Sequence, residues 1–163
     1  MTHILALDTT SKHTSISISR GEDVLFEYNF TSHNLLSSTL IPTIEFLLKS
    51  AGLTLNDIDV FGIAIGPGLF TGIRVGLSTL KGLLFTGKKP VAAVVTLKAL
   101  AYKYIHSKSE MLIFPLIDAR RDEVYLAGYN LSGQKIDEIL PPCLIHINDL
   151  PEKLASFQAA ACY

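Results

Sequence analysis

The sequence predicts an α/β protein in which helices flank a mixed β-sheet. Three short strand-like segments open the chain close together, as in an antiparallel meander, and residues 34–107 then alternate helical and strand-like patterns. The order then restarts, because a strand ending at Asp118 echoes the opening strand that ends at Asp8. We therefore predict a complete first lobe at residues 1–107 and the start of a second lobe of the same type at residues 108–163.

The opening strands are expected at residues 3–7, 14–19 and 24–30. In the second of them, Ile16 and Ile18 alternate with small polar residues, which is typical of a half-buried strand. Short polar turns separate the three segments, so they are expected to pair in chain order.

A first helix is predicted over residues 34–50, with Ser32 as its N-cap and a kink at Pro42. Its core-facing stripe consists of Leu36, Leu40, Ile44 and Leu47. A second, weaker stripe on the same helix consists of Leu35, Thr39 and Phe46. The second stripe has no predicted partner within the lobe.

The centre of the chain predicts a buried strand at residues 60–65, a break at Gly66-Pro67-Gly68 and a helix at residues 71–86. Apolar residues at helical spacing are predicted to face the core: Ile73, Leu77, Leu80 and Leu84. A second stripe of mostly small residues runs beside them: Gly72, Gly76, Thr79 and Leu83. Each interior glycine costs about 1 kcal/mol relative to alanine, so another backbone is expected to approach closely there.

That close approach has two interpretations: packing against this lobe's own sheet or helices, or docking of another subunit. The glycine-rich break before the helix admits anion binding as a third. The phosphate-loop pattern G-x-x-x-x-G-K-[ST] is absent, however, which argues against a phosphate role.

The remaining elements follow the same order as the opening ones. They are a strand at residues 91–95, a helix at 96–107, strands at 111–117 and 123–129 paired antiparallel, a third strand within 134–147 and a helix at 148–156. Pro141-Pro142 interrupts the third of these strands. The order then stops, which predicts that the C-terminal part of the second lobe is missing; the alternative is a single domain with the second meander as an appendage.

Bulk properties exclude several classes of protein. No apolar run reaches the roughly 20 residues that a membrane span requires, and the opening residues lack the pattern of a secretory signal. Cys143 and Cys162 are too few for a disulfide framework, which fits the reducing cytoplasm. The formal net charge is -1, so this chain alone is not expected to supply strong electrostatic affinity for nucleic acid.

Three segments together resemble the TsaB family, also called YeaZ. They are ILALDTT at residues 4–10, GPGLFTGIRVG at 66–76 and IDARRDEVYLA at 117–127. The central one matches the family pattern GPGxFTGxRxG, with Leu69 where the family usually has a small serine. The resemblance implies the actin-like (ribonuclease H-like) superfold of actin, sugar kinases and Hsp70, and it ends before about Leu140.

The resemblance implies a non-catalytic subunit of the bacterial machinery that forms N6-threonylcarbamoyladenosine at position 37 of certain tRNAs. The implied partners are the catalytic paralogue TsaD and the ATPase TsaE, with tRNA bound only through the complex and no membrane involved. Alone, such a subunit is expected to form a homodimer through its first two helices. The implied interface consists of Leu35, Thr39, Phe46, Gly72, Gly76, Thr79 and Leu83.

Asp8 and Asp118 are the candidate nucleotide-binding residues. In this superfold, acidic residues at first-strand ends often hold a metal–nucleotide complex, but Thr9 and Ala119 stand here where a phosphate loop carries glycine. Turn capping, weak ATP or ADP binding and catalysis are the alternatives. We expect no required cofactor and no metal, since no histidine pair has H-x-x-x-H spacing.

A second class of function is a small-molecule kinase or ATPase of the same superfold, which ATP turnover would distinguish. Two sites with basic side chains are candidates for ligand contacts. Arg74 is expected to be a surface or ion-pair residue, or else a ligand anchor. The charge-balanced run at residues 120–123, RRDE, predicts a local salt-bridged turn, with a tRNA contact as the alternative.

Overall fold

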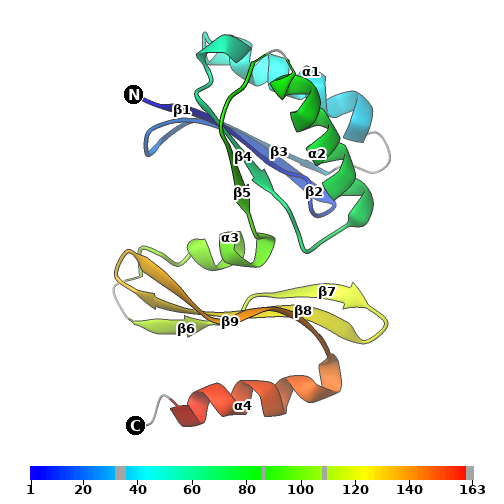
Figure 1. The fold of residues 1–163 in the computed structure, drawn as a ribbon, viewed down its shortest axis with the longest axis vertical. Helices are drawn as coiled ribbons and strands as arrows, with labels where there is room; N and C mark the ends of the chain where they lie inside the picture. The colour runs from blue at the N-terminus through cyan, green and yellow to red at the C-terminus, as the bar shows by residue number, and fades with distance from the viewer. Residues whose placement is uncertain (32–35, 86, 108–109, 161–163) are drawn as a thin grey trace. The chain divides into compact units, whose positions relative to one another are not determined.

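The computed structural model describes residues 1–31, 36–85, 87–107 and 110–160, which form two compact units, Met1–Thr96 and Leu97–Tyr163 (Figure 1). The predicted boundary after residue 107 differs from this division. Helix α3 (Thr96–Tyr102), shorter than the predicted helix at 96–107, belongs almost entirely to the second unit. None of the helices in the described ranges is long and apolar enough to cross a membrane.

The first unit is a mixed sheet with flanking helices, as predicted, but it contains two helices because the third predicted one lies in the second unit. Its elements are β1 (His3–Asp8), β2 (His13–Arg20), β3 (Asp23–Thr31), α1 (Leu36–Ser50), the 3-10 helix η1 (Leu55–Asp57), β4 (Val60–Ala64), α2 (Phe70–Leu84) and β5 (Val91–Val94). The strand order is β3-β2-β1-β4-β5. Strands β1, β4 and β5 run parallel, and β2 pairs antiparallel with both β1 and β3, which confirms the opening meander.

The register of the sheet places large apolar residues on one face. Leu5 lies opposite both Ile18 of β2 and Phe61 of β4, and all three are almost completely buried. Helices α1 and α2 pack on this face, and the predicted α1 residues Leu40 and Ile44 belong to the same core. The predicted core stripe of α1 is therefore confirmed over its described residues.

The buried face of helix α2 is shifted toward the glycines but keeps most of the predicted stripe. Gly72, Gly76 and Leu80 are buried. Of the other predicted core residues, Leu77 and Leu84 pack partly buried against the core, and Ile73 is half-buried. The stripe that contains the glycines thus faces the interior. Hydrophobic periodicity located the helix correctly but placed the centre of its buried face beside the true one, because glycine adds no apolar side chain to the pattern.

The second unit is an antiparallel sheet with one helix on each face (Figure 1). After α3 come β6 (Met111–Ile113), β7 (Leu116–Arg120), β8 (Glu123–Ser132), β9 (Lys135–His146), the 3-10 helix η2 (Ile147–Asp149) and α4 (Leu150–Ala160). Strand β9 pairs along the whole of β8, while β6 and β7 pair with successive parts of β8. The rings of Phe114 and Phe157 lie 5.2 Å apart and join α4 to the sheet.

Two proline sites explain how this sheet departs from its prediction. The strand predicted at 111–117 is interrupted at Phe114-Pro115, since proline cannot donate to a strand ladder. In β9 the register shifts so that Leu140 lies opposite Gly128 and Cys143 opposite Leu126. The shift leaves Pro141-Pro142 outside the paired positions, so the predicted third strand forms despite them.

Candidate functional site

The turn after β1 and the start of α2 form one tightly packed junction. The backbone N–H of Leu69 donates to the carbonyl of Thr10 over 2.6 Å. The Thr9 hydroxyl donates to the carbonyl of Gly72 over 2.9 Å, and the Thr9 side chain is fully buried. Two hydrogen bonds therefore fix the first turn of α2 against the end of the central strand.

Glycine is required in α2 because Thr9 lies directly against the helix. A Cβ atom on Gly72 would lie 2.0 Å from the Thr9 carbonyl oxygen, and one on Gly76 would lie 2.3 Å from the Thr9 hydroxyl oxygen. Both distances are far shorter than any real contact. The close approach expected at these glycines is thus made within the first unit, as the intramolecular interpretation proposed.

The predicted interface changes accordingly. Thr9 occupies the space beside Gly72 and Gly76 that a second chain would need, so their assignment to a docking surface is wrong. Leu83 also packs partly against the core, and Thr79 is half-buried. The assignment carried over from the family therefore fails at the two glycines, which serve the lobe's own packing, while a docking role for Thr79 and Leu83 stays a prediction.

The predicted interface residues on α1 that the structure describes lie at the surface, unlike the glycines of α2. Thr39 and Phe46 are exposed, Phe46 to 60%, while Leu35 lies outside the described residues. A role for Thr39 and Phe46 in docking therefore remains a prediction.

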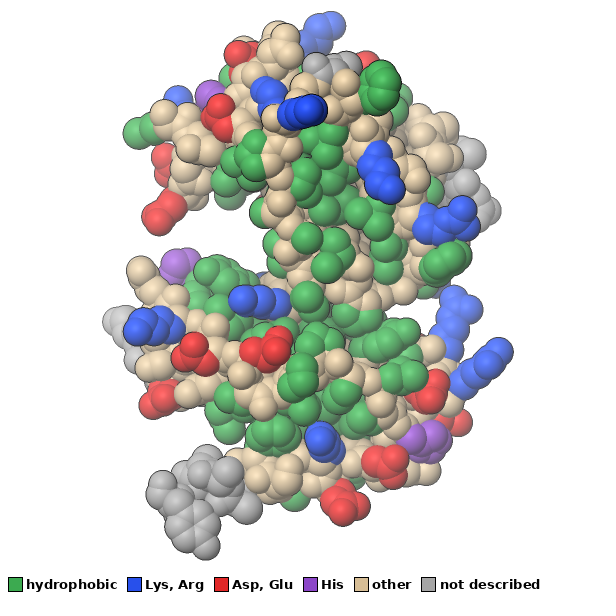
Figure 2. All heavy atoms as spheres, in the orientation of Figure 1, with side chains coloured by type: hydrophobic (Ala, Val, Ile, Leu, Met, Phe, Trp, Pro, Cys, Tyr) green, Lys and Arg blue, Asp and Glu red, His purple; other side chains and the backbone are tan. Residues whose placement is uncertain are grey.

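Large apolar side chains that the sequence analysis missed lie exposed on the same two helices. Phe70 and Phe85, at the two ends of α2, are exposed to 72% and 94%, and Ile41 of α1 is also exposed. Arg74 lies 5.3 Å from the centre of the Phe70 ring, a cation–π contact at the helix surface. Figure 2 shows apolar side chains interspersed with basic ones over the visible face of this unit. The sequence did hold a signal for this exposure, because Phe70 and Phe85 belong to neither predicted stripe of α2.

Asp8 and Asp118 make the same local contact in their separate units. One carboxylate oxygen of Asp8 accepts hydrogen bonds from the Thr10 backbone N–H, 2.8 Å, and from the Thr10 hydroxyl, 2.7 Å. One carboxylate oxygen of Asp118 accepts from the Arg120 backbone N–H over 2.7 Å. Both aspartates therefore cap turns, which was one of the predicted alternatives; nucleotide binding remains a prediction.

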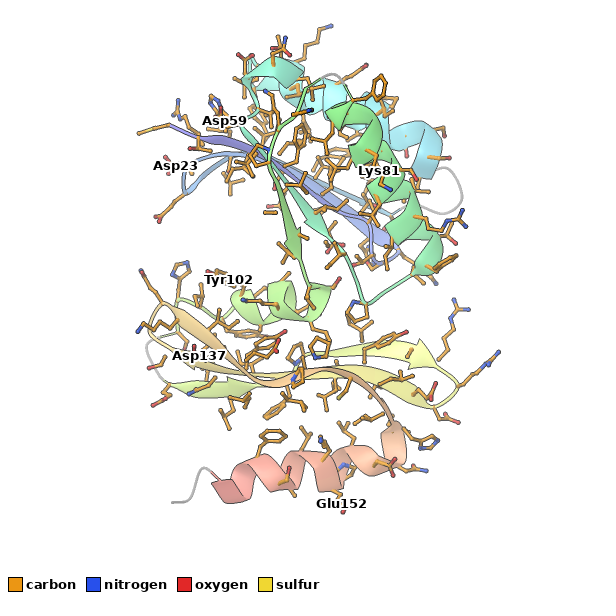
Figure 3. All side chains as sticks on the ribbon, in the orientation of Figure 1. Asp23, Asp59, Lys81, Tyr102, Asp137 and Glu152 are labelled. Atoms are coloured by element: carbon orange, nitrogen blue, oxygen red, sulfur yellow. The ribbon has the colours of Figure 1, made fainter. Side chains whose placement is uncertain are left out.

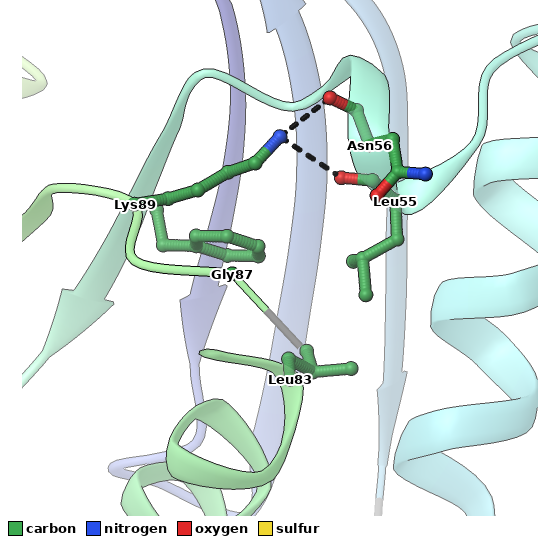
Figure 4. Close-up of a pocket in the computed structure, with 6 residues that line it drawn as sticks. Leu55, Asn56, Leu83, Gly87 and Lys89 are labelled. Atoms are coloured by element: carbon green, nitrogen blue, oxygen red, sulfur yellow. Dashed lines mark hydrogen bonds between the residues drawn. The ribbon is translucent and has the colours of Figure 1, made fainter. Parts of the chain in front are cut away.

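A ring of carbonyl groups at η1 is occupied by the chain's own ammonium group. Lys89 Nζ donates to the carbonyls of Leu55, 3.4 Å, and Asn56, 2.5 Å (Figure 4). It also donates to the carbonyl of Ile58. The ammonium group caps the C-terminal end of the 3-10 helix, where cations are stabilised. The arrangement joins η1 to the segment that leads into β5, and it is structural.

The carboxylate of the last η1 residue, Asp57, holds the residue that precedes η1. Asp57 accepts hydrogen bonds from the Thr54 hydroxyl, 2.6 Å, and the Thr54 backbone N–H, 2.7 Å. These hydrogen bonds, the side-chain one first, lower the pKa of Asp57 below its ordinary value of 3.8. The turn therefore favours the ionised carboxylate.

Acidic side chains do not gather into a metal site in the part of the chain that the structure describes. No group of three or more His, Cys, Asp or Glu residues there is placed to hold a metal ion. In the second unit, for example, Asp137 and Glu152 lie on separate elements, β9 and α4 (Figure 3).

Comparisons with known proteins agree with the motifs and the fold. A family model described as TsaD, tRNA N6-adenosine threonylcarbamoyltransferase, matches residues 31–161. The Bacillus subtilis protein named tRNA threonylcarbamoyladenosine biosynthesis protein TsaB is 30% identical over 151 residues, covering 93% of this chain and 65% of that protein. The chain thus spans just under two thirds of this relative's length.

Solved structures add the fold. YeaZ from Pseudomonas aeruginosa is 29% identical with a TM-score of 0.80, covering 90% of this chain and 68% of that one. A ROK hexokinase from Thermus thermophilus, 15% identical with a TM-score of 0.50 over 82% of this chain and 47% of that one, shares the fold alone. These findings confirm the predicted actin-like architecture. With the GPGLFTG junction between β4 and α2, they show that the chain belongs to the TsaB family, also called YeaZ.

Proposed function

We propose that this chain acts as a non-catalytic subunit of the cytoplasmic assembly that forms N6-threonylcarbamoyladenosine in tRNA. The observation that carries the proposal is its membership of the TsaB family, whose Bacillus subtilis relative is named for that pathway. The non-catalytic role is supported by the turn-capping hydrogen bonds of Asp8 and Asp118 and by the side chains of Thr9 and Ala119 beside them.

The proposed docking surface for a TsaD-type paralogue is the outer face of α1 and α2. It consists of Thr39, Phe46, Phe70 and Phe85. Exposed aromatic side chains of this kind supply much of the binding energy in protein interfaces. The hydrogen bond from Thr9 fixes the buried side of α2. A partner that binds the outer face therefore orders little of the backbone, and binding costs little conformational entropy. The proposal extends to a homodimer that uses the same face when the paralogue is absent, and to TsaE as a third component.

Substitution of Phe46 tests the docking surface. Phe46→Lys should abolish or strongly weaken co-elution with the TsaD-type paralogue, because it places a charge in an apolar contact. Val24→Lys is the matched control, since Val24 of β3 is exposed to 61% and Phe46 to 60%. Equal co-elution of both variants and the unmodified chain, measured by size-exclusion chromatography with light scattering, would exclude this face.

The absence of catalysis is tested by ATP turnover of the purified chain. We expect no turnover above background, with or without the paralogue's tRNA substrate. Turnover that Asp8→Ala removes, in a variant that stays folded by circular dichroism, would instead establish a kinase or ATPase of the same superfold. No contact in the described residues favours that second class.

A further inference from the structure

The turn between β7 and β8 has an unusual backbone. Arg120, Arg121 and Asp122 have φ values of 68°, 54° and 61°, and within the described ranges they are the non-glycine residues with positive φ. A two-residue hairpin turn needs positive φ at its central positions, which is why Asn-Gly and Asp-Gly are common there. Side chains with a Cβ are disfavoured in this region, so the sequence holds this turn at a cost in stability.

Two other hairpins of the molecule avoid that cost. The β2–β3 turn has Gly21 and the β8–β9 turn has Gly133, each with φ 61°. The β7–β8 turn carries two arginines in its left-handed positions instead. Strained backbone of this kind is concentrated at functional sites, which directs attention to the arginine side chains.

Hydrogen bonds on both sides fix the strained turn. The Arg120 backbone N–H donates to the Asp118 carboxylate over 2.7 Å, and the Ile147 backbone N–H donates to the Asp122 carbonyl over 2.8 Å. The turn is therefore anchored to its own strand and to the segment that follows β9. Its two arginines are presented from a rigid support.

The guanidinium groups themselves are available. Arg120, Arg121 and Asp122 are all exposed. The local salt bridges predicted for residues 120–123 do not form: in the part of the chain with described coordinates, no ion pair joins either guanidinium to a carboxylate. Free guanidinium groups bind phosphate oxygens through paired hydrogen bonds.

We propose that the Arg120-Arg121 turn contacts phosphate groups of tRNA. The inference rests on the proposed function, which supplies tRNA as the substrate of the assembly. Residues 118–123 include no large apolar side chain, so charge governs recognition at the turn itself, and the tRNA of the proposed function supplies phosphate as the anion. The carboxylates of Asp122 and Glu123 balance the charge of the two arginines, so the positive potential does not extend beyond this turn. The turn would therefore supply only a few of the phosphate contacts that hold tRNA in the assembly.

The test measures tRNA binding by the assembly of this chain with its TsaD-type paralogue at several salt concentrations. The double variant Arg120→Gln, Arg121→Gln should bind more weakly, and the slope of log K against log salt should fall in magnitude by about one to two. Lys135→Gln is the control, since Lys135 lies beside the β8–β9 turn at the other end of β8. It should leave affinity and slope unchanged.

A second variant separates binding from folding. Arg121→Asn with Asp122→Gly installs the favoured Asn-Gly turn, so it should raise the melting temperature while weakening tRNA binding. Unchanged affinity and slope in both variants would overturn the proposal. Loss of the paralogue instead of tRNA would also overturn it and would identify an acidic protein surface. Failure of the unmodified chain to assemble or to bind tRNA would refute the proposed function itself.

Discussion

The two aspartate turns of the molecule share one contact and differ in everything around it. Asp8 and Asp118 each accept the backbone N–H two residues further along, over 2.8 Å and 2.7 Å. After Asp8 the turn is buried and packs against α2, whereas after Asp118 it is exposed. A repeated local hydrogen bond thus closes a turn in both units, and the residues that follow decide whether the turn packs into the core or stays exposed.

The buried turn should tolerate change least, which Gly72→Ala tests most severely. The new Cβ would meet the Thr9 carbonyl oxygen at 2.0 Å, and overpacking of this kind costs roughly 1–3 kcal/mol. Gly82→Ala is the control, because nothing lies within 4 Å of that position. It should gain up to about 1 kcal/mol in helix propensity. Chemical denaturation of both variants measures the difference; equal stabilities would mean that Thr9 does not restrict α2.

Removal of each aspartate compares the two turns directly. Asp8→Ala loses two hydrogen bonds in a part-buried setting and should cost about 1–2 kcal/mol, whereas Asp118→Ala loses one exposed hydrogen bond and should cost less than about 1 kcal/mol. Thermal unfolding of the two variants gives the comparison. A larger loss at Asp118 would reverse the assignment of structural and exposed turns.

Two buried threonine hydroxyls, one hydrogen-bonded and one not, test how much the hydrogen bond at the buried turn contributes to stability. Thr9→Val removes the hydrogen bond to the Gly72 carbonyl and should cost about 1 kcal/mol. Thr14→Val should be neutral or stabilising, because the Thr14 hydroxyl is buried and has no hydrogen-bond partner among the residues that the structure describes. Urea titration distinguishes them. Identical effects would show that burial alone, and not the hydrogen bond, fixes the junction.

The Thr54–Asp57 turn gives a third comparison, through pH. The pKa of Asp57 is lowered in the folded state, so its contribution to stability is present above 3.8 and is lost as pH falls through the folded pKa. The stability of Asp57→Asn should therefore change less between neutral pH and about pH 3 than the stability of the unmodified chain. Melting temperatures across that range provide the measurement, and an unchanged pH profile would contradict it.

Most of the fold followed from periodicity. The opening meander, α1 and strand β4 have apolar side chains in patterns that the structure reproduces. The face of α2 did not follow, because its closest contact is made where Gly72 and Gly76 have no side chain to count. The break at Pro115 was visible as a residue type but was not used to divide the strand.

The candidate site was less accessible to sequence reasoning. The turn-capping alternative for Asp8 followed from the residue type, and the hydrogen bonds to Thr10 agree with it. The left-handed backbone at Arg121 could not be predicted, since turn preferences assign such positions to glycine or asparagine. The exposure of Phe70 and Phe85 depends on which face of α2 is buried, and the sequence left the glycine side of that face open between core packing and docking.

The proline pair in β9 has a consequence for how this molecule meets other chains. An edge strand offers a row of unpaired backbone donors and acceptors to which a foreign strand can add, the first step toward aggregation. Strand β9 pairs with β8 alone among the described strands, and Pro141-Pro142 lies within it. Because the two prolines lack N–H donors, an added strand cannot form a continuous hydrogen-bond ladder with β9. The residues that shift the register thus also protect this edge of the sheet against strand addition.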